Sequence, residues 1–563
     1  MIQENNDIQT TDKYKRRSKH IIGIILLIPT FIILFTFILL PILRTFLRSF
    51  TDFNFVTNGK NVYLKNYLLT SSDGVGKIAI TNTIITTLFQ ATIGVSLSLL
   101  FARLSSNLHR IVKYVLCIMF IIVSITYIAP IGIKQIFSSS HNGYFNAFLL
   151  TREKEIISFL EQPLFLRLIM VLLPILLGIG PLYLLFTVCY MNKDKLKKYI
   201  HLAISLQIVI SFLSFESVKI VTGFPSVNYS AHNLNVHIYD YLMMRFEGGY
   251  GSALIIIMGL IILLFLLISN GVIWLVDFLL KSNNTKHPKK HPISTTHKKH
   301  SLPSIVIFIF LFLVTIILLY PFLQMCFDTF KPLNELYVFP TRIVATHPTI
   351  SNYKNTLSQI VQANQGLPIS TYVINSCITI ILSTAIMLVV LIISGIGLSF
   401  FSLRIKKLLL LGITYTFVLC PIALISFNYS NYNSIIRLVL PLIFKSSSFG
   451  LSIYLGSKIF DKYINVYNKN NELLFSSNNI VKYLLGLLPI SLLASLSAWF
   501  APSYYLTSPD NMTLFQLFQR AHNFISTSGP NPIVEVCLLI LSMIIPIGLV
   551  IVCVPFLLNS LKE

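Results

Sequence analysis

Hydrophobic runs of about 20 residues follow one another along nearly the whole chain, and short polar segments separate them. A run of this length crosses the ~30 Å hydrocarbon core of a bilayer as one helix. The pattern therefore predicts an all-α, polytopic membrane protein with twelve spanning helices. The expected spans cover residues 21–42, 79–101, 114–136, 165–190, 200–222, 252–280, 304–327, 371–400, 408–427, 435–457, 483–505 and 532–557.

A segment rich in Lys, His, Pro, Ser and Thr, residues 281–303, divides these spans into two sets of six. Its lack of apolar residues is typical of a solvated connector. We prefer this interpretation to a metal site built from its histidines, His287, His291, His297 and His300. The predicted organisation is a basic N-terminal segment 1–20, a first half 21–280, the linker 281–303, a second half 304–557 and a tail 558–563.

The two halves resemble each other in sequence, and the matching segments occur in the same order. Ser49–Asn54 matches Asp328–Asn334, Asn66–Tyr67 matches Asn352–Tyr353, and Asn82–Thr83 matches Asn375–Ser376. Because each half has an even number of expected spans, the repeats should run parallel through the membrane. Parallel repeats in transporters enclose a pathway between them. The repeat thus indicates a transporter or a channel.

Charge adds a predicted orientation. Only 11% of the residues are charged, against roughly 25% in soluble domains. The net charge of +23 is concentrated in alternate gaps between the runs, including KYKRRSKH near the N-terminus and the central linker. Basic residues favour the cytoplasmic side of a membrane. We therefore expect a plasma-membrane protein with both termini and the linker in the cytoplasm. We expect no nucleic-acid partner.

Further residues follow the repeated segments in each half. The first half continues with Phe215, Thr222, Gly223, Pro225, Tyr239, Gly249, Tyr250 and Ala253. The second half carries Thr329, Phe330, Lys331, Phe339, Pro340, Pro348, Thr349, Asn352, Tyr353 and Asn375–Ser376, and later Trp499, Leu506–Pro509 and Thr513–Leu514. In this order, the two sets resemble the two permease subunits of carbohydrate ABC importers of the maltose or glycerol-phosphate type.

The resemblance implies a type I importer permease fold, with two subunits that are usually separate chains fused into one. Such permeases are not enzymes and hold no cofactor; separate cytoplasmic ATPase subunits use ATP, and an extracytoplasmic binding protein delivers the sugar, oligosaccharide or sugar derivative. This chain agrees in having no P-loop. Its nearest approach, Gly74-Val75-Gly76-Lys77, lacks the first glycine of the motif and is followed by Ile78 instead of a hydroxyl residue.

The loop between the fourth and fifth expected spans departs from the family. There the family carries a coupling helix with Glu-Ala-Ala and a glycine, whereas residues 191–201 read MNKDKLKKYIH. The corresponding loop of the second half, residues 458–483, also lacks Glu-Ala-Ala. Either these loops dock an ATPase through altered contacts, or they only anchor the topology. The candidate coupling residues are Lys193, Asp194, Lys197, Asp461, Lys462 and Glu472.

Polar and aromatic residues inside expected spans are candidates for a substrate pathway, since charges are costly there and sugars stack on aromatic rings. Glu216 and Lys219 are three residues apart, so they could also neutralise each other on one helix face. For the others, core packing or hydrogen bonding between helices is the alternative. The complete set is Asn82, Phe212, Phe215, Glu216, Lys219, Tyr372, Asn375 and Trp499.

Two other functions stay open at the level of sequence. The altered coupling loops are consistent with a degenerate permease that serves as a membrane scaffold or sensory partner. An ion-coupled secondary transporter ranks lower, because the expected spans contain few acids that could relay protons.

Overall fold

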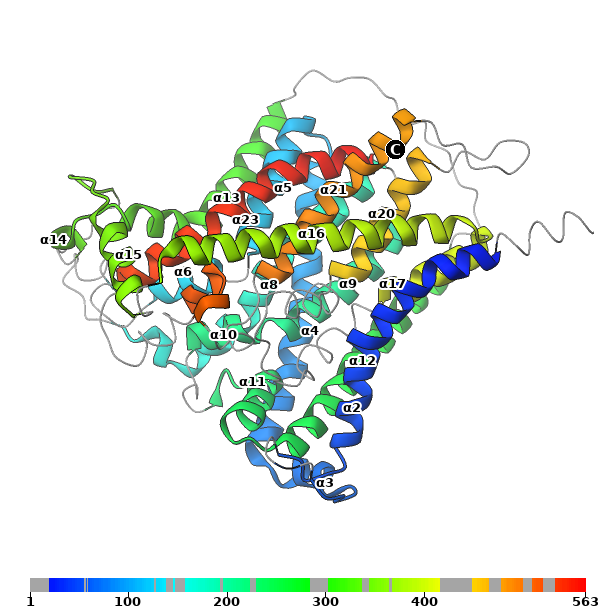
Figure 1. Cartoon of the computed structure of the whole chain (residues 1–563), viewed down its shortest axis with the longest axis horizontal. Coiled ribbons are helices and arrows are strands. Elements are labelled where there is room, and N and C mark those ends of the chain that lie inside the picture. Colours follow the sequence, from blue (N-terminus) through cyan, green and yellow to red (C-terminus); the bar gives the residue numbers. More distant parts are fainter. Residues whose placement is uncertain are drawn as a thin grey trace, which may run out of the picture. The chain divides into compact units, whose positions relative to one another are not determined.

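The structure is a computed structural model (Figure 1), and the part of the chain that it describes is helical. It describes residues 20–54, 57, 59–125, 128–137, 145–146, 157–192, 196–222, 229–283, 302–336, 344–363, 367–415, 448–464, 477–499, 509–519 and 532–562. Within these ranges there is no β-strand, only an isolated bridge between Thr51 and Asn61. The predicted all-α class is confirmed for these residues.

Eight helices of the described residues are long and apolar enough to cross a membrane, in agreement with a multi-pass membrane protein. They coincide with eight of the expected spans. They are the helix His20–Arg48, which includes η1 (Phe35–Leu39) and α2 (Leu40–Arg48), then α4 (Gly74–Ser105), α8 (Pro163–Met191), α12 (Gly248–Asn283), α13 (Leu302–Asp328), α16 (Ile369–Ser399), α21 (Ser477–Trp499) and α23 (Pro532–Leu561).

The other expected spans are bent, broken or outside the described ranges. The third expected span is a pair of helices, α5 (Arg110–Val123) and α6 (Ile128–Ile136), bent by 68°. The fifth is α9 (Leu196–Leu213) followed, after a break at Ser214, by α10 (Phe215–Thr222). The ninth and tenth are represented by α17 (Leu403–Tyr415) and α20 (Ser448–Tyr463), with 416–447 not described. The total of twelve spans stays a prediction.

Two compact units make up the chain, and each contains helices from both predicted halves. Unit one comprises residues 1–44 and 349–563, and unit two comprises residues 45–348. In unit one, the first helix of the chain packs on the end of α16, where Gly23 lies against Phe400 and Gly397 lies against Leu27. In unit two, α13 packs against α5 and α6. Each half therefore contributes its first helix to the unit that holds the rest of the other half.

α8 is the central helix of unit two. Two thirds of its most apolar window (67%) is buried, more than in the other seven candidate spans of the described residues. α4, α5 and α9 pack around it. Short elements complete the two units: α3 (Lys65–Ser72), η2 (Phe159–Glu161), α11 (Leu234–Tyr239), η4 (Asp240–Met244), α14 (Leu333–Leu336), α15 (Ser351–Ala363) and η7 (Pro509–Asn511). α3 and α11 lie near the start of α4, at the lower end of Figure 1.

Candidate functional site

A carboxylate marks the start of α4. Asp73 is the N-cap of this helix, and its Oδ1 accepts the backbone N–H of Gly76 at 2.9 Å. Such a cap satisfies one of the unpaired N–H groups of the first turn, and the negative charge interacts favourably with the helix dipole. Because the side chain is only 15% exposed, its second oxygen also needs partners.

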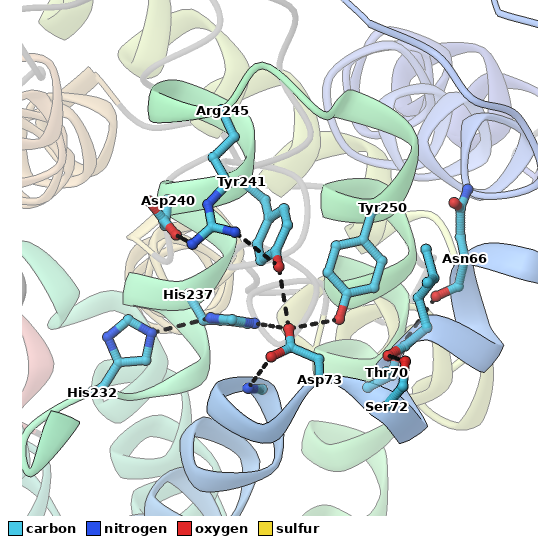
Figure 2. Close-up of polar contacts among 12 residues, drawn as sticks. Asn66, Thr70, Ser72, Asp73, His232, His237, Asp240, Tyr241, Arg245 and Tyr250 are labelled. Atoms are coloured by element: carbon cyan, nitrogen blue, oxygen red, sulfur yellow. Dashed lines mark hydrogen bonds and ion pairs between the residues drawn. The ribbon is translucent and has the colours of Figure 1, made fainter. Parts of the chain in front are cut away.

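Three side chains from another part of unit two donate to that second oxygen (Figure 2). His237 Nε2 lies 2.8 Å from Asp73 Oδ2, the hydroxyl of Tyr250 lies 3.0 Å away, and the hydroxyl of Tyr241 lies 3.4 Å away. They come from α11, from the first turn of α12 and from η4, respectively. Asp73 therefore joins the start of α4 to the whole α11–α12 segment.

A second histidine extends the network. His232 Nε2 lies 3.1 Å from His237 Nδ1, and both rings are buried. Burial and the neighbouring His237 lower the pKa of His232 to about 4. Burial also lowers the pKa of His237, although the Asp73 carboxylate opposes this. Both rings are therefore neutral near pH 7.

Neutral rings give the network a direction. The carboxylate can only accept, so His237 carries its proton on Nε2 and its Nδ1 is an acceptor. His232 must then donate from Nε2 to His237. Burial would raise the pKa of Asp73, but the Gly76 N–H and the donors on His237 and Tyr250 outweigh burial and hold that pKa below its ordinary value. The chain of donors ends on a carboxylate that stays ionised.

Arg245 forms the exposed edge of the network. Its guanidinium group pairs with Asp240 at 2.8 Å and lies 4.4 Å from the centre of the Tyr241 ring. Burial tends to lower the pKa of Arg245, but Asp240 and Tyr241 raise it overall. The backbone here is unusual: η4 is a π-helix, and Phe246, which follows it, has a φ of 57°. Such conformations are rare and occur often at functional sites.

The repeated motifs of the sequence surround this network. The side-chain amide of Asn66 donates to the carbonyl groups of Ser49 and Thr51 at 2.9 and 2.8 Å. Gly249 donates its N–H to the Phe53 carbonyl at 2.7 Å, and a Cβ at Gly249 would lie 2.0 Å from the Thr51 oxygen. Residues Ser49–Thr51 are thus held between Asn66 and Gly249, and any larger residue at position 249 would require the backbone near Thr51 to shift.

Asn82 and Thr83 on α4 form a second set of contacts in unit two. The Asn82 amide donates to the carbonyl groups of Tyr229 and His232, at 3.4 and 3.0 Å. The Thr83 hydroxyl accepts the N–H of Leu234 at 2.8 Å. Together they fix the start of α11, and we call this arrangement the Asn–hydroxyl clamp.

Unit one contains the same clamp on α16. The Asn375 amide donates to the carbonyl groups of Asp510 and Met512, at 2.7 and 3.0 Å. The Ser376 hydroxyl accepts the N–H of Leu514 at 2.9 Å. In both units a helix N-cap residue comes directly before the residue whose N–H donates to the hydroxyl. Asn233 precedes Leu234 in unit two, and Thr513 precedes Leu514 in unit one. The sequence match between Asn82–Thr83 and Asn375–Ser376 therefore extends to their hydrogen bonds.

The predicted pathway residues have different surroundings. Asn82 and Asn375 belong to the clamps, while Phe212 and Tyr372 are fully buried within their own units. The side chains of Phe215, Glu216, Lys219 and Trp499 are outside the described part, although their backbones lie in α10 and α21. Asn82 and Phe212 belong to unit two, whereas Tyr372 and Asn375 belong to unit one, and their role in a pathway stays a prediction.

Two predicted coupling residues contact helices of unit one. Asp461 on α20 forms an ion pair with Lys406 on α17, which is buried. Lys462 donates to the carbonyl groups of Ser560 and Lys562 at the end of α23. Lys197 is exposed on α9. Lys193, Asp194 and Glu472, and the linker histidines, lie outside the described residues.

Sequence reasoning did not identify the Asp73 network. A signal was present: Asp73 precedes a long apolar run in the manner of an N-cap, and residues 229–250 are rich in His and Tyr. The sequence alone does not show that Asp73 and residues 229–250 contact each other in the fold. Among the described residues, no three His, Cys, Asp or Glu side chains are placed to hold a metal ion. The described site consists of hydrogen bonds to one carboxylate.

No family model matches the chain, and no curated protein matches it.

Proposed function

We propose that the chain is a fused permease that moves a sugar, oligosaccharide or sugar derivative across the plasma membrane, driven by separate ATPase subunits. The observation that carries this proposal is the Asn–hydroxyl clamp, which occurs once in each unit with the same donors and acceptors. A hydrogen-bond pattern repeated on two helices 293 positions apart supports two related permease subunits fused in a single chain, since 375 minus 82 is 293.

The exchange of first helices is consistent with this proposal. A permease that alternates its access must hold two bundles together while their contacts change. A helix that belongs to one half but packs in the other half's unit supplies such a tether.

The charge pattern suggests which face the Asp73 network occupies. α4 begins beside Asp73 and ends at Ser105, next to the basic gap that contains Arg103, Arg110 and Lys113. If that gap is cytoplasmic, as basic loops are, the network lies at the extracytoplasmic end of α4. That is the face at which a binding protein would deliver its sugar.

The test is purification of the intact chain from membranes in mild detergent, followed by identification of associated proteins and by uptake of labelled maltose, glucose and glycerol phosphate in vesicles. We expect an ATPase to co-purify and ATP-dependent uptake of one of these probes. Replacing residues 465–476, between α20 and α21, with a Gly/Ser segment of equal length should abolish both. The same replacement in the linker, at 284–301, is the matched control and should abolish neither.

A second candidate function, a membrane scaffold or sensory partner, is favoured by the contacts of Asp461 and Lys462. Both predicted coupling residues are engaged within unit one, with Lys406 and with the end of α23. On this alternative no ATPase co-purifies and the chain gives no ATP-dependent uptake of any of the probes. ATP hydrolysis by a reconstituted complex, stimulated by one of the sugars, would exclude it.

A further inference from the structure

The central helix of unit two is weakened in its middle by its own sequence. Pro174 and Pro181 lie inside α8, within the stretch LPILLGIGP. Because proline has no N–H, the carbonyl groups of Met170 and Leu177, four residues earlier, lose their ordinary donors. Two glycines in the same stretch lower its helix propensity further. The backbone ladder of α8 is therefore incomplete between Met170 and Pro181.

Glutamine side chains from two neighbouring helices supply donors to this stretch. Gln90 on α4 donates from Nε2 to the Met170 carbonyl at 2.7 Å, and this is the acceptor that Pro174 leaves without a partner. Gln207 on α9 donates from Nε2 to the Pro174 carbonyl at 2.9 Å. Both glutamines are buried. A buried amide in a span is costly unless it is hydrogen-bonded, so these contacts account for their position.

The hydroxyl of Ser124, at the end of α5, accepts a backbone N–H of α8. Gly180 donates its N–H to Ser124 Oγ at 2.8 Å, instead of only to the Leu176 carbonyl that an α-helix would offer. Ser124 Oγ in turn lies 3.1 Å from that Leu176 oxygen and 2.9 Å from the Phe120 oxygen of its own helix. One hydroxyl proton thus has two acceptors, one on α8 and one on α5, and it can exchange between them.

The carbonyl oxygen of the Gln207 side chain, Oε1, receives no hydrogen bond from the described residues. This oxygen is buried and rests on Gly178, where a Cβ would lie 1.9 Å from it. Buried acceptors without donors are rare, and each needs an explanation. An acceptor that is unused in one arrangement of the helices is available to a donor in another. Gln207 therefore has the hydrogen-bonding capacity for two positions of α8.

We propose that residues Met170–Pro181 form a hinge in α8 and that Gln90, Ser124 and Gln207 are its positioning residues. The part of α8 beyond the hinge leads at Met191 directly into MNKDKLKKYIH, so movement of that loop bends α8 at the incomplete ladder. Side-chain donors from three helices reach the carbonyl groups of Met170, Pro174 and Leu176 and can hold them hydrogen-bonded during bending, which their burial requires. This inference rests on the proposed function, in which the loop receives the ATPase movement.

The test measures bending in the full chain in lipid nanodiscs. Spin-labelled unnatural amino acids replace Leu164, which is exposed in the first turn of α8, and Met191 at its end, and their separation is measured by electron–electron resonance. The variant Pro174→Ala/Pro181→Ala restores both N–H donors. Pro163→Ala is the matched control, because Pro163 is at the first helical position, where no ladder bond is lost.

We expect a broad or two-peaked distance distribution for the native chain and for Pro163→Ala, and one narrow peak for Pro174→Ala/Pro181→Ala. Uptake of the sugar probe should fall about tenfold or more only in the double variant, although its melting temperature rises. Equal widths in all three proteins would overturn the hinge. The distance measurement needs neither ATPase nor substrate, so it can succeed or fail independently of the proposed function.

A double-mutant cycle tests the positioning role. Gln90→Leu should lower the melting temperature of the native chain, because the Met170 carbonyl loses its donor. In the Pro174→Ala background the restored N–H at position 174 serves that carbonyl, and the same substitution should cost much less. An equal loss in both backgrounds would show that Gln90 is only a packing residue and would overturn its assignment.

Discussion

At the scale of single residues, Asp73 is the most connected group of the described network. One oxygen caps α4, and the other receives three side-chain donors from the segment between residues 237 and 250. Only an ionised carboxylate offers enough acceptor positions for all four. Asp73 thus has two roles. The sequence can suggest its role as a helix cap, but it cannot suggest the tertiary contacts of its second oxygen.

We predict that Asp73→Asn lowers the free energy of unfolding by about 1–3 kcal/mol, because an amide N–H₂ group would face the N–H of His237 and leave a donor unsatisfied. The measurement is thermal unfolding of the purified protein. Asp240→Asn is the control: it breaks an ion pair whose Arg245 side chain is 51% exposed, and such pairs contribute less than about 1 kcal/mol. Equal losses in the two variants would contradict the special role of Asp73.

At the scale of elements, the Asn–hydroxyl clamps decide where two short helices begin. We predict that Asn82→Leu and Asn375→Leu each lower the melting temperature by a similar amount, since each removes two hydrogen bonds to backbone carbonyl groups. Thr92→Val is the control, because the Thr92 hydroxyl is exposed and bonds only within its own helix. A loss confined to one of the two asparagine variants would be evidence against equivalent clamps.

The attachment of α11 to α4 should also depend on pH. The folded protein holds His232 at a pKa of about 4, whereas the unfolded chain binds a proton near the ordinary value of 6.5. The unfolded state therefore gains protons first, and stability falls as the pH drops from about 6.5 to about 4. The lowered pKa of Asp73 adds a further loss at more acidic pH.

Burial also lowers the pKa of His237, so this histidine contributes in the same direction. The variant His237→Gln removes that contribution, because glutamine can donate to Asp73 and accept from His232 but does not titrate in this range. We expect its melting temperature to decline less between pH 6.5 and 4 than that of the native chain. Tyr241 and Arg245 also face the network but keep their charge states across this interval. An unchanged pH profile would contradict the contribution of His237.

At the scale of the whole molecule, the exchange of first helices makes each unit dependent on both halves. We predict that fragments produced by cutting the chain between 284 and 301 associate stoichiometrically when co-expressed, since unit one needs residues 20–44 and unit two needs α13. Each fragment expressed alone should be degraded or aggregate, because its partner surface for the missing helix is uncovered. Purification of co-expressed and single fragments tests this. Stable, monodisperse single fragments would contradict the exchange.

The long apolar runs by themselves determined the membrane class, the helical fold and eight of the expected spans, because crossing hydrocarbon requires a helix of known length whatever its neighbours are. The N-cap at Asp73 and the repeated Asn–hydroxyl pairs were also visible locally, as residue types at suitable positions. Only the tertiary structure decided which carbonyl groups Asn82 and Asn375 reach, that His237 meets Asp73 across 164 positions, and that α13 packs with the first half. These are contacts between segments far apart in the chain, and hydrophobic periodicity carries no information about which segment a given face will meet.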